Sequence, residues 1–402
     1  MVEIYRPETA EELRDLVSAA VANEAPLEVL GHGTKRDFGR PVETERLIQA
    51  DRLAGIELYE PGELVLSAGA GTPLAEIEAA LVDNHQAFAF EPPDLGPLFG
   101  APAGQATIGG VVAANLAGPR RIKTGAARDH MLGFTAVTGR GDIVKSGGRV
   151  VKNVTGYDLS KLMTGSFGTL AVLTSVTLKV LPAAETERTL LVAGGGRRGL
   201  LAGLRAAVGS AYDVSAAAWL PEPAARAAEV ASEEVAAIRI EGPEPSVRYR
   251  ADALKTLLGA KDAELGEIDQ AASRDLWRKI GEVAPLLGGA TQVVKASIPP
   301  ATADEVWERL SAIEALEGYA DWAGGLLWLG CATPDPQVVS QVRDLIAAGG
   351  GHATLIKTPD EVRRQVEMFQ PQPAPLARLT ARIKESFDPG RVLNPGRMYA
   401  NV

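Results

Sequence analysis

Three glycine-containing segments have the residue types and spacing to hold a large phosphorylated ligand. Gly31-His32-Gly33-Thr34-Lys35 follows a short apolar run, and such a loop presents successive backbone N–H groups to phosphate oxygens. Thr107-Ile108-Gly109-Gly110 opens a run of small apolar residues, where paired glycines let backbone approach a bulky ligand closely. Gly165-Ser166-Phe167-Gly168 leads into a β-rich stretch. Each segment alone is equally typical of an ordinary turn.

The first two segments together predict a pyrophosphate lying on the N–H groups of the 31–35 loop and of the 107–110 turn. They do not form the dinucleotide fingerprint of a Rossmann unit. No third glycine opens a helix after the loop, and no strand ending in an acidic residue follows at the required interval.

The order of the three segments resembles that of the vanillyl-alcohol-oxidase-type flavoproteins, which have a PCMH-type FAD-binding domain. The tail from Phe387 to Met398, with Asn394-Pro395-Gly396 inside it, is similar to the tail of FAD-linked 2-hydroxy-acid dehydrogenases. The segment from Lys152 to Leu162 is most similar to the FAD-binding E subunits of bacterial glycolate oxidases. The resemblance covers residues 1 to about 182 and the last fifteen or so.

This resemblance implies one non-covalently bound FAD. The residues that it implies as FAD-binding are Gly31, His32, Gly33, Thr34, Lys35, Pro93, Asp94, Thr107, Ile108, Gly109, Gly110, Asn115, Gly118, Gly168, Val172 and Asn394. Some relatives attach FAD through a histidine of the first loop, but His32 stands at a glycine position and lacks the neighbours of that pattern. An insertion up to Gly104 leaves the contact of Pro93 and Asp94 with the nucleotide open.

Residues that could catalyse the reaction are few. Catalytic dehydrogenases of the resembled superfamily often carry histidines and an acid on the cap, which bind a metal and the substrate carboxylate. The chain has four histidines, and only His352 falls in the cap region, so we expect no metal site. Lys152 and Tyr157 flank a segment that the resemblance places beside the flavin, and they are the only catalytic candidates. Tyr157 is equally consistent with packing at a helix start.

The resemblance implies an FAD-binding subunit of a 2-hydroxy-acid oxidoreductase complex, with glycolate oxidation to glyoxylate as the expected reaction. Its partners would be a second flavoprotein subunit and an iron–sulfur subunit, because a single cysteine, Cys331, cannot ligate a cluster. Two alternatives stay open. One is a self-sufficient FAD-dependent dehydrogenase or oxidase of another hydroxy acid or alcohol, and the other is a non-catalytic FAD-holding assembly subunit.

Composition agrees with an ordinary globular protein of 402 residues, 46% of them hydrophobic and 23% charged. The net charge of −10 argues against nucleic acid as a partner. No signal peptide and no apolar run of membrane-spanning length is visible, so a cytoplasmic location is expected, with attachment to the inner membrane only through partners.

The periodicities predict an α+β fold. Residues 1–182 would form the two-subdomain PCMH-type FAD-binding domain, 183–380 an α+β, ferredoxin-like cap, and 381–402 a segment returning to the first domain. Thr9 and Glu12 predict a capped helix, and Thr72 is expected to cap another. The ferredoxin-like assignment rests on strands that alternate with amphipathic helices after residue 183.

Two further groups of residues could bind anions or face the flavin. Arg120, Arg121 and Lys123 directly follow the second glycine segment, and a guanidinium binds carboxylate or phosphate through a planar fork. A solvated loop is the alternative interpretation. Trp322 and Trp328 are the cap-side candidates for facing the flavin, although core packing explains tryptophans equally well.

Overall fold

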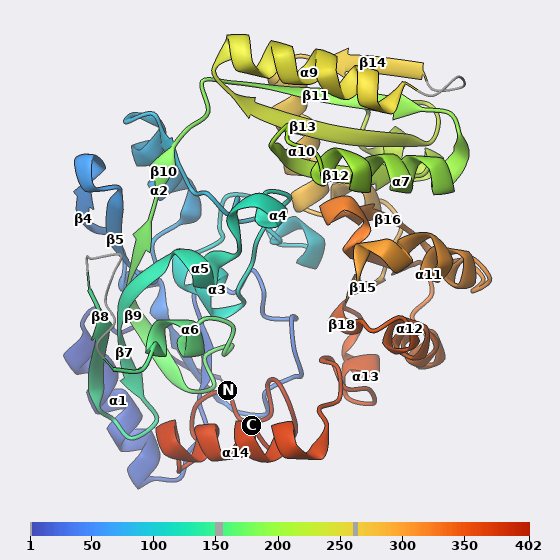
Figure 1. Ribbon diagram of the computed structural model, residues 1–402. Helices are drawn as coiled ribbons and strands as arrows, with labels where there is room; N and C mark the ends of the chain where they lie inside the picture. The colour runs from blue at the N-terminus through green and yellow to red at the C-terminus, as the bar shows by residue number, and fades with distance from the viewer. Residues whose placement is uncertain (1, 149–155, 260–263) are drawn as a thin grey trace. The chain divides into compact units, whose positions relative to one another are not determined.

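The polypeptide folds into two units, each built from separate stretches of chain. The computed structural model describes residues 2–148, 156–259 and 264–402 (Figure 1). Unit 1 contains Met1–Leu116, Gly125–Ala183 and Glu367–Val402, and unit 2 contains Ala117–Thr124 and Ala184–Val366. No described helix has both the length and the apolar character needed to cross a membrane.

Unit 1 contains two larger sheets. The first is parallel, with strand order β1-β3-β2, and the second is antiparallel, with order β4-β5-β9-β7-β8. Their strands are β1 (Glu3–Tyr5), β2 (Glu28–Leu30), β3 (Arg46–Gln49), β4 (Ile56–Glu60), β5 (Val65–Gly69), β7 (Met131–Thr138), β8 (Ile143–Gly147) and β9 (Ala171–Lys179). A small antiparallel pair joins β6 (Gln86–Ala87) to β10 (Leu181–Pro182).

The sequence predicts the N-caps of two helices in unit 1, and the structure confirms the first of them. The helices of this unit are α1 (Ala10–Ala22), α2 (Leu74–Val82), α3 (Ile108–Ala113), α5 (Ala127–His130), α6 (Leu159–Met163) and α14 (Ala374–Phe387). Thr9 caps α1, because its hydroxyl accepts the N–H of Glu12. The expected cap at Thr72 is wrong: Pro73 occupies the N-cap of α2, and the Thr72 hydroxyl donates to Gly69 O.

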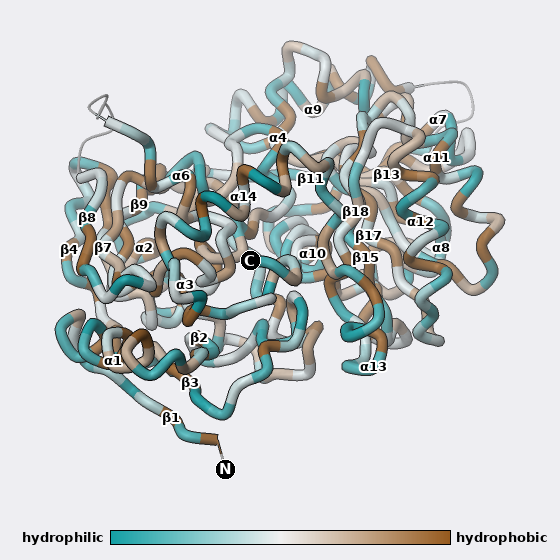
Figure 2. The backbone as a smooth tube through the Cα atoms, turned by 90° about the horizontal axis from the view of Figure 1, so that it is seen from below, coloured by the Kyte–Doolittle hydropathy of each residue, from teal (hydrophilic) through white to brown (hydrophobic). Residues whose placement is uncertain are grey.

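One hydrophobic core of unit 1 joins the beginning, middle and end of its chain. Leu13 and Val17 of α1 pack with Ile48 of β3, Val137 of β7 and Leu393 of the C-terminal segment, all fully buried. Apolar and polar residues alternate around α1 as expected for a helix with one buried face (Figure 2). The tail therefore completes the core beside β2, where Leu27 N–H donates to Val392 O.

Unit 2 is built on an eight-stranded antiparallel sheet of order β14-β11-β13-β12-β16-β17-β15-β18. Its strands are β11 (Thr186–Ala193), β12 (Val214–Leu220), β13 (Val235–Gly242), β14 (Glu264–Ile268), β15 (Gln292–Ser297), β16 (Glu317–Asp321), β17 (Leu326–Cys331) and β18 (His352–Lys357). Its helices are α4 (Arg121–Thr124), α7 (Gly196–Val208), α8 (Glu222–Ala227), α9 (Glu244–Leu258), α10 (Gln270–Gly281), α11 (Ala303–Leu310), α12 (Pro336–Ala348) and α13 (Asp360–Arg363).

The sheet of unit 2 is a topological duplication. In its first half, β11, α7, β12, β13, α9 and β14 follow the βαββαβ order of a ferredoxin-like unit. The second half repeats this order with β15, α11, β16, β17, α12 and β18. The halves meet where β12 pairs with β16, at Trp219 and Ala320. The sequence predicts the ferredoxin-like character but shows no repeat.

Candidate functional site

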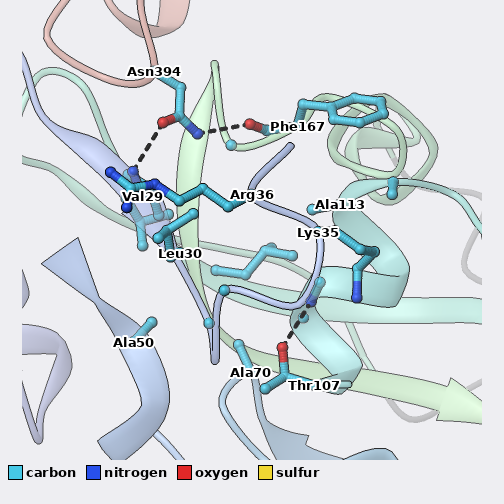
Figure 3. A pocket seen from close by; sticks show the side chains of 18 of the residues that line it. Val29, Leu30, Lys35, Arg36, Ala50, Ala70, Thr107, Ala113, Phe167 and Asn394 are labelled. Atoms are coloured by element: carbon cyan, nitrogen blue, oxygen red, sulfur yellow. Dashed lines mark hydrogen bonds between the residues drawn. The ribbon is translucent and has the colours of Figure 1, made fainter. Parts of the chain in front are cut away.

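A deep hollow in unit 1 gathers all three glycine segments of the sequence (Figure 3). Its empty space is about 830 Å³ when the space at its open mouth is counted. It is lined by Val29, Leu30, Gly31, His32, Gly33, Thr34, Lys35, Arg36, Ala50, Ala70, Thr107, Gly109, Gly110, Ala113, Ala114, Ser166, Phe167, Gly168, Ala171, Val172, Leu173, Asn394 and Arg397.

The loop after β2 presents unused donors to this hollow. Within the described residues, no acceptor is hydrogen-bonded to the backbone N–H groups of His32, Gly33, Thr34 or Lys35. Four consecutive free N–H groups on a cavity wall form an anion-binding nest. The loop needs glycine at Gly31, because a Cβ there would lie 2.4 Å from Thr107 Oγ1, and Gly33 has a φ of +79°.

The 107–110 turn shapes the wall, and most of its N–H groups already have partners within the protein. The N–H of Ile108 bonds to Thr72 O, that of Gly109 to Ala70 O, and that of Gly110 to Thr107 Oγ1. Three of the four N–H groups that were expected to face a pyrophosphate at this turn are therefore engaged within the protein. Its glycines serve close packing, since a Cβ on Gly109 would lie 2.7 Å from the Cβ and the O of Ala70.

Lys35, Arg36 and Arg397 are the cationic side chains among the lining residues, and both arginines form ion pairs with Glu28. Burial lowers the pKa of the Lys35 ammonium group to about 8, although the charge of Asp94 acts in the opposite direction. Lys35 Nζ lies 3.2 Å from Thr34 Oγ1, and a Cβ on Gly110 would lie 3.3 Å from Nζ. Lys35 Nζ therefore lies between the 31–35 loop and the 107–110 turn (Figure 3).

Asn394 fixes the opposite wall. Its Oδ1 accepts the N–H of Val29 at 2.8 Å, and its Nδ2 donates to Phe167 O at 2.8 Å (Figure 3). Glycine is needed at position 168 for two reasons. A Cβ there would lie 2.9 Å from Asn394 Nδ2, and the residue has a φ of +68°. The amide therefore joins β2 to the third glycine segment.

The buried Lys384 joins the third glycine segment to the C-terminal segment. Lys384 Nζ of α14 donates to Thr169 O, Leu393 O and Asp388 Oδ2 at 2.7 to 2.8 Å. Asp388 in turn accepts the N–H groups of Val392 and Leu393. The pair is fully buried and every group has a partner, so the tail and the third glycine segment are held as one piece.

His32 makes a specific contact inside the loop. Its Nδ1 lies 2.9 Å from Gln105 O, so the tautomer with hydrogen on Nδ1 donates to this carbonyl and leaves Nε2 as an acceptor. This bond orients the ring along the segment that precedes the 107–110 turn.

Most residues that the resemblance implied as FAD-binding line the hollow, but five do not. Ile108 and Pro93 are buried in the protein, and Asn115 Oδ1 accepts the N–H of Arg128. Asp94 accepts the N–H groups of Gly96 and Gly104, and it affects the hollow only through its charge on Lys35. Gly118 belongs to unit 2, where its carbonyl accepts the indole N–H of Trp322.

The catalytic candidates receive no support from the site. Tyr157 is 90% exposed and does not line the hollow. Lys152 lies outside the described residues. In the described part of the chain, no three His, Cys, Asp or Glu side chains are grouped as metal ligands.

Arg397 is a wall residue that the sequence reasoning missed. It donates from Nη2 to the carbonyls of Lys35 and Arg36, and Glu28 forms ion pairs with Arg36 at 2.6 Å and Arg397 at 3.6 Å. These contacts join the C-terminal segment to the backbone of the first loop. The tail motif contains this arginine three residues after Asn394, and that spacing was the available signal.

The residues present fit a flavin dinucleotide: a long hollow with a nest of free N–H groups, a cation beside it and walls of glycine and alanine. Comparison with known proteins agrees. A model described as an FAD binding domain matches residues 3–147. The glycolate oxidase subunit GlcE of Escherichia coli (strain K12) is 35% identical over 392 residues, covering 97% of each chain.

Two further likenesses concern the fold. The glycolate oxidase subunit GlcD of Bacillus subtilis (strain 168) is 39% identical over 115 residues, which is 29% of this chain and 23% of that one. The solved structure of 4-ethylphenol oxidase from Gulosibacter chungangensis has a TM-score of 0.73 at 14% identity, covering 99% of this chain and 89% of that one. The predicted α+β, PCMH-type fold is thereby confirmed.

Proposed function

Because the chain belongs to the family of the glycolate oxidase subunit GlcE and is an FAD-dependent oxidoreductase, we propose that it oxidises glycolate to glyoxylate only as part of a complex. The observation that carries the FAD assignment to particular residues is the nest at 32–35, with four free N–H groups on the wall of the hollow.

Different residues of the hollow would contact different parts of FAD. The nest and Lys35 would bind the pyrophosphate, because both place positive charge at one end of the loop. The small side chains of Ala113, Ala171 and Val172 would lie against the flat parts of the cofactor. Bound FAD would supply the two-electron acceptor that oxidation of a substrate alcohol requires. The protein supplies orientation and excludes water.

The partners in this proposal are a second flavoprotein subunit and an iron–sulfur subunit. The relatives GlcE and GlcD are each named as a subunit of glycolate oxidase. An iron–sulfur cluster requires four ligands, usually cysteine thiolates, and Cys331 is the one cysteine of the sequence. Its thiol is buried, and burial raises its pKa, so it is a poor ligand.

Purification of the chain from its native host at native expression level tests this proposal. The expected result is a flavin absorption spectrum together with two co-purifying chains, one of them carrying iron. Recovery of the chain alone, with glycolate-dependent dye reduction of several turnovers per second, would favour the self-sufficient dehydrogenase instead. A complex that keeps its full activity after this chain loses its flavin would identify an assembly subunit.

A further inference from the structure

One face of the unit 2 sheet collects three cationic or titratable groups around two tryptophans. Lys295 of β15 pairs across the sheet with Trp328 of β17 and with Thr354 of β18. His352 pairs with Ser297, two positions along β15, so its side chain lies on the same face as Lys295. Both indoles, of Trp322 and Trp328, are buried.

The third cation comes from the separate stretch 117–124. Arg121 lies with its guanidinium carbon 4.7 Å from the ring centre of Trp322. Lys295 Nζ lies 5.4 Å from the same ring centre and 5.5 Å from that of Trp328. Lysine and arginine thus share one aromatic platform.

The neighbours of Arg121 are used to hold its segment in place. Arg120 pairs with Glu241, whose carboxyl has a pKa lowered to about 2: burial would raise it, but the charges of Arg239 and Arg120 outweigh that effect. Lys123 pairs with Asp213 at 2.7 Å, and the Gly118 carbonyl accepts the Trp322 indole N–H at 3.2 Å. These bonds fix Arg121 over Trp322.

The cationic groups repel one another in the free protein. Burial and the charge of Arg121 lower the pKa of Lys295 to about 8, with Asp321 acting in the opposite direction. Burial and the charges of Lys295 and Arg121 also lower the pKa of His352. In the described residues, Lys295 Nζ forms no hydrogen bond and no ion pair. Asp321, the one acid that offsets Lys295, accepts the N–H of Trp322 through Oδ1.

We propose that Lys295, Arg121 and His352, on the Trp322–Trp328 platform, bind the carboxylate of a small organic acid. An anion removes the mutual repulsion and supplies the acceptor that Lys295 lacks. A planar carboxylate fits the guanidinium fork, and the indole faces pack against its short carbon chain. That the acid is the 2-hydroxy acid substrate rests on the proposed function; the anion site itself rests on unit 2 alone.

Tryptophan fluorescence of the full chain tests this site, because both platform indoles would report binding. Flavin is first removed, so that no oxidation occurs and loss of FAD binding cannot imitate the result. Titration with glycolate should give a saturable change, whereas glycolamide, which replaces the carboxylate by a neutral amide, should give none. Flavin content of the same preparation before stripping is the separate measure of the proposed function.

The variants locate the site. Lys295→Met and Arg121→Gln should each weaken glycolate binding on the order of tenfold or more, because each removes a charged hydrogen bond. The matched control is Arg198→Gln, which removes one positive charge from unit 2 at a side chain that is 90% exposed. Wild-type binding by Lys295→Met and Arg121→Gln would overturn the site. Saturable binding of sulfate but not of glycolate would overturn its assignment to carboxylates.

Discussion

Asn394 and Val29 are joined by a 2.8 Å hydrogen bond although 365 positions separate them in the sequence. Replacing Asn394 with alanine leaves the N–H of Val29 and the carbonyl of Phe167 without their partner. We expect a loss of about 1–3 kcal/mol in the free energy of unfolding and a lower flavin content. Thermal melting and absorbance at the flavin band measure both. Asn401→Ala, at an exposed position of the same tail, is the control, and equal melting and flavin content in the two variants would contradict the role of Asn394.

Gly110→Val should strongly reduce flavin content in a folded chain. The new Cβ would lie 3.1 Å from Thr107 Oγ1 and 3.3 Å from Lys35 Nζ, and its methyl groups would occupy the space beside the nest. Gly62→Val is the control, because nothing lies within 4 Å of a Cβ there. Full flavin occupancy of a Gly110→Val chain with a native circular dichroism spectrum would refute the placement of the pyrophosphate.

The affinity for FAD should depend on pH through Lys35. Its pKa in the free protein is about 8, and a bound pyrophosphate favours the charged ammonium, so the pKa rises in the complex. The dissociation constant should therefore stay constant below pH 8 and increase above it, by at most about tenfold per pH unit. Fluorescence titration of the stripped chain with FAD between pH 6 and 10 measures this.

Lys35→Met provides the comparison for the pH profile. The variant should bind FAD roughly ten- to a hundredfold more weakly at pH 7, since one charge-assisted contact is lost. The affinity of the variant for FAD should also stay constant above pH 8, where that of the wild type falls. A variant that keeps the wild-type rise above pH 8 would show that another group titrates.

Flavin should leave the denatured chain. His32 Nδ1 is engaged with Gln105 O, and the FAD-binding role expected of this histidine is non-covalent. Acid precipitation should release yellow FAD into the supernatant, and His32→Ala should lower the affinity without abolishing it. A precipitated chain heavier by the mass of one FAD would reveal a covalent link.

The purified, FAD-loaded chain should oxidise glycolate and lactate very slowly without its partners. Tyr157 is exposed and does not line the hollow, so this catalytic candidate is not placed there as a general base. General-base help contributes roughly a hundred- to ten-thousandfold in rate. Steady-state dye reduction with a panel of 2-hydroxy acids measures the turnover, and several per second with any of them would contradict the need for partners.

The sequence predicts the wall of the hollow well at glycines that stand where no Cβ could be accommodated. Gly31 and Gly168 sit where a Cβ would collide with a neighbouring side chain, so the motif and the structure agree. For the 107–110 turn, a motif does not show that the N–H groups of Ile108 and Gly109 are already bonded to Thr72 and Ala70. The sequence does not predict the role of Arg397, whose partners are backbone carbonyls of the first loop.

The cap region shows a similar limit. The strands β15 and β18 can be predicted from their apolar β-branched residues, but β12, with the alanine-rich sequence Val-Ser-Ala-Ala-Ala-Trp-Leu, cannot. Without β12 and β16, the duplication of the ferredoxin-like order remains hidden. The sequence also does not predict that Arg120 and Lys123 form ion pairs. Their partners, Glu241 and Asp213, lie far along the chain.

The stretch 117–124 has a consequence for the order of events during synthesis. It leaves the ribosome well before its partners in unit 2, because Asp213 lies 90 positions after Lys123, Glu241 lies 121 after Arg120, and Trp322 lies 204 after Gly118. Nascent domains generally fold in order from the N-terminus. Here a basic segment must wait for these partners until most of the chain has emerged. A chain that terminates before Asp213 would lack all three of these partners, and quality-control proteins would be presented with Arg120, Arg121 and Lys123.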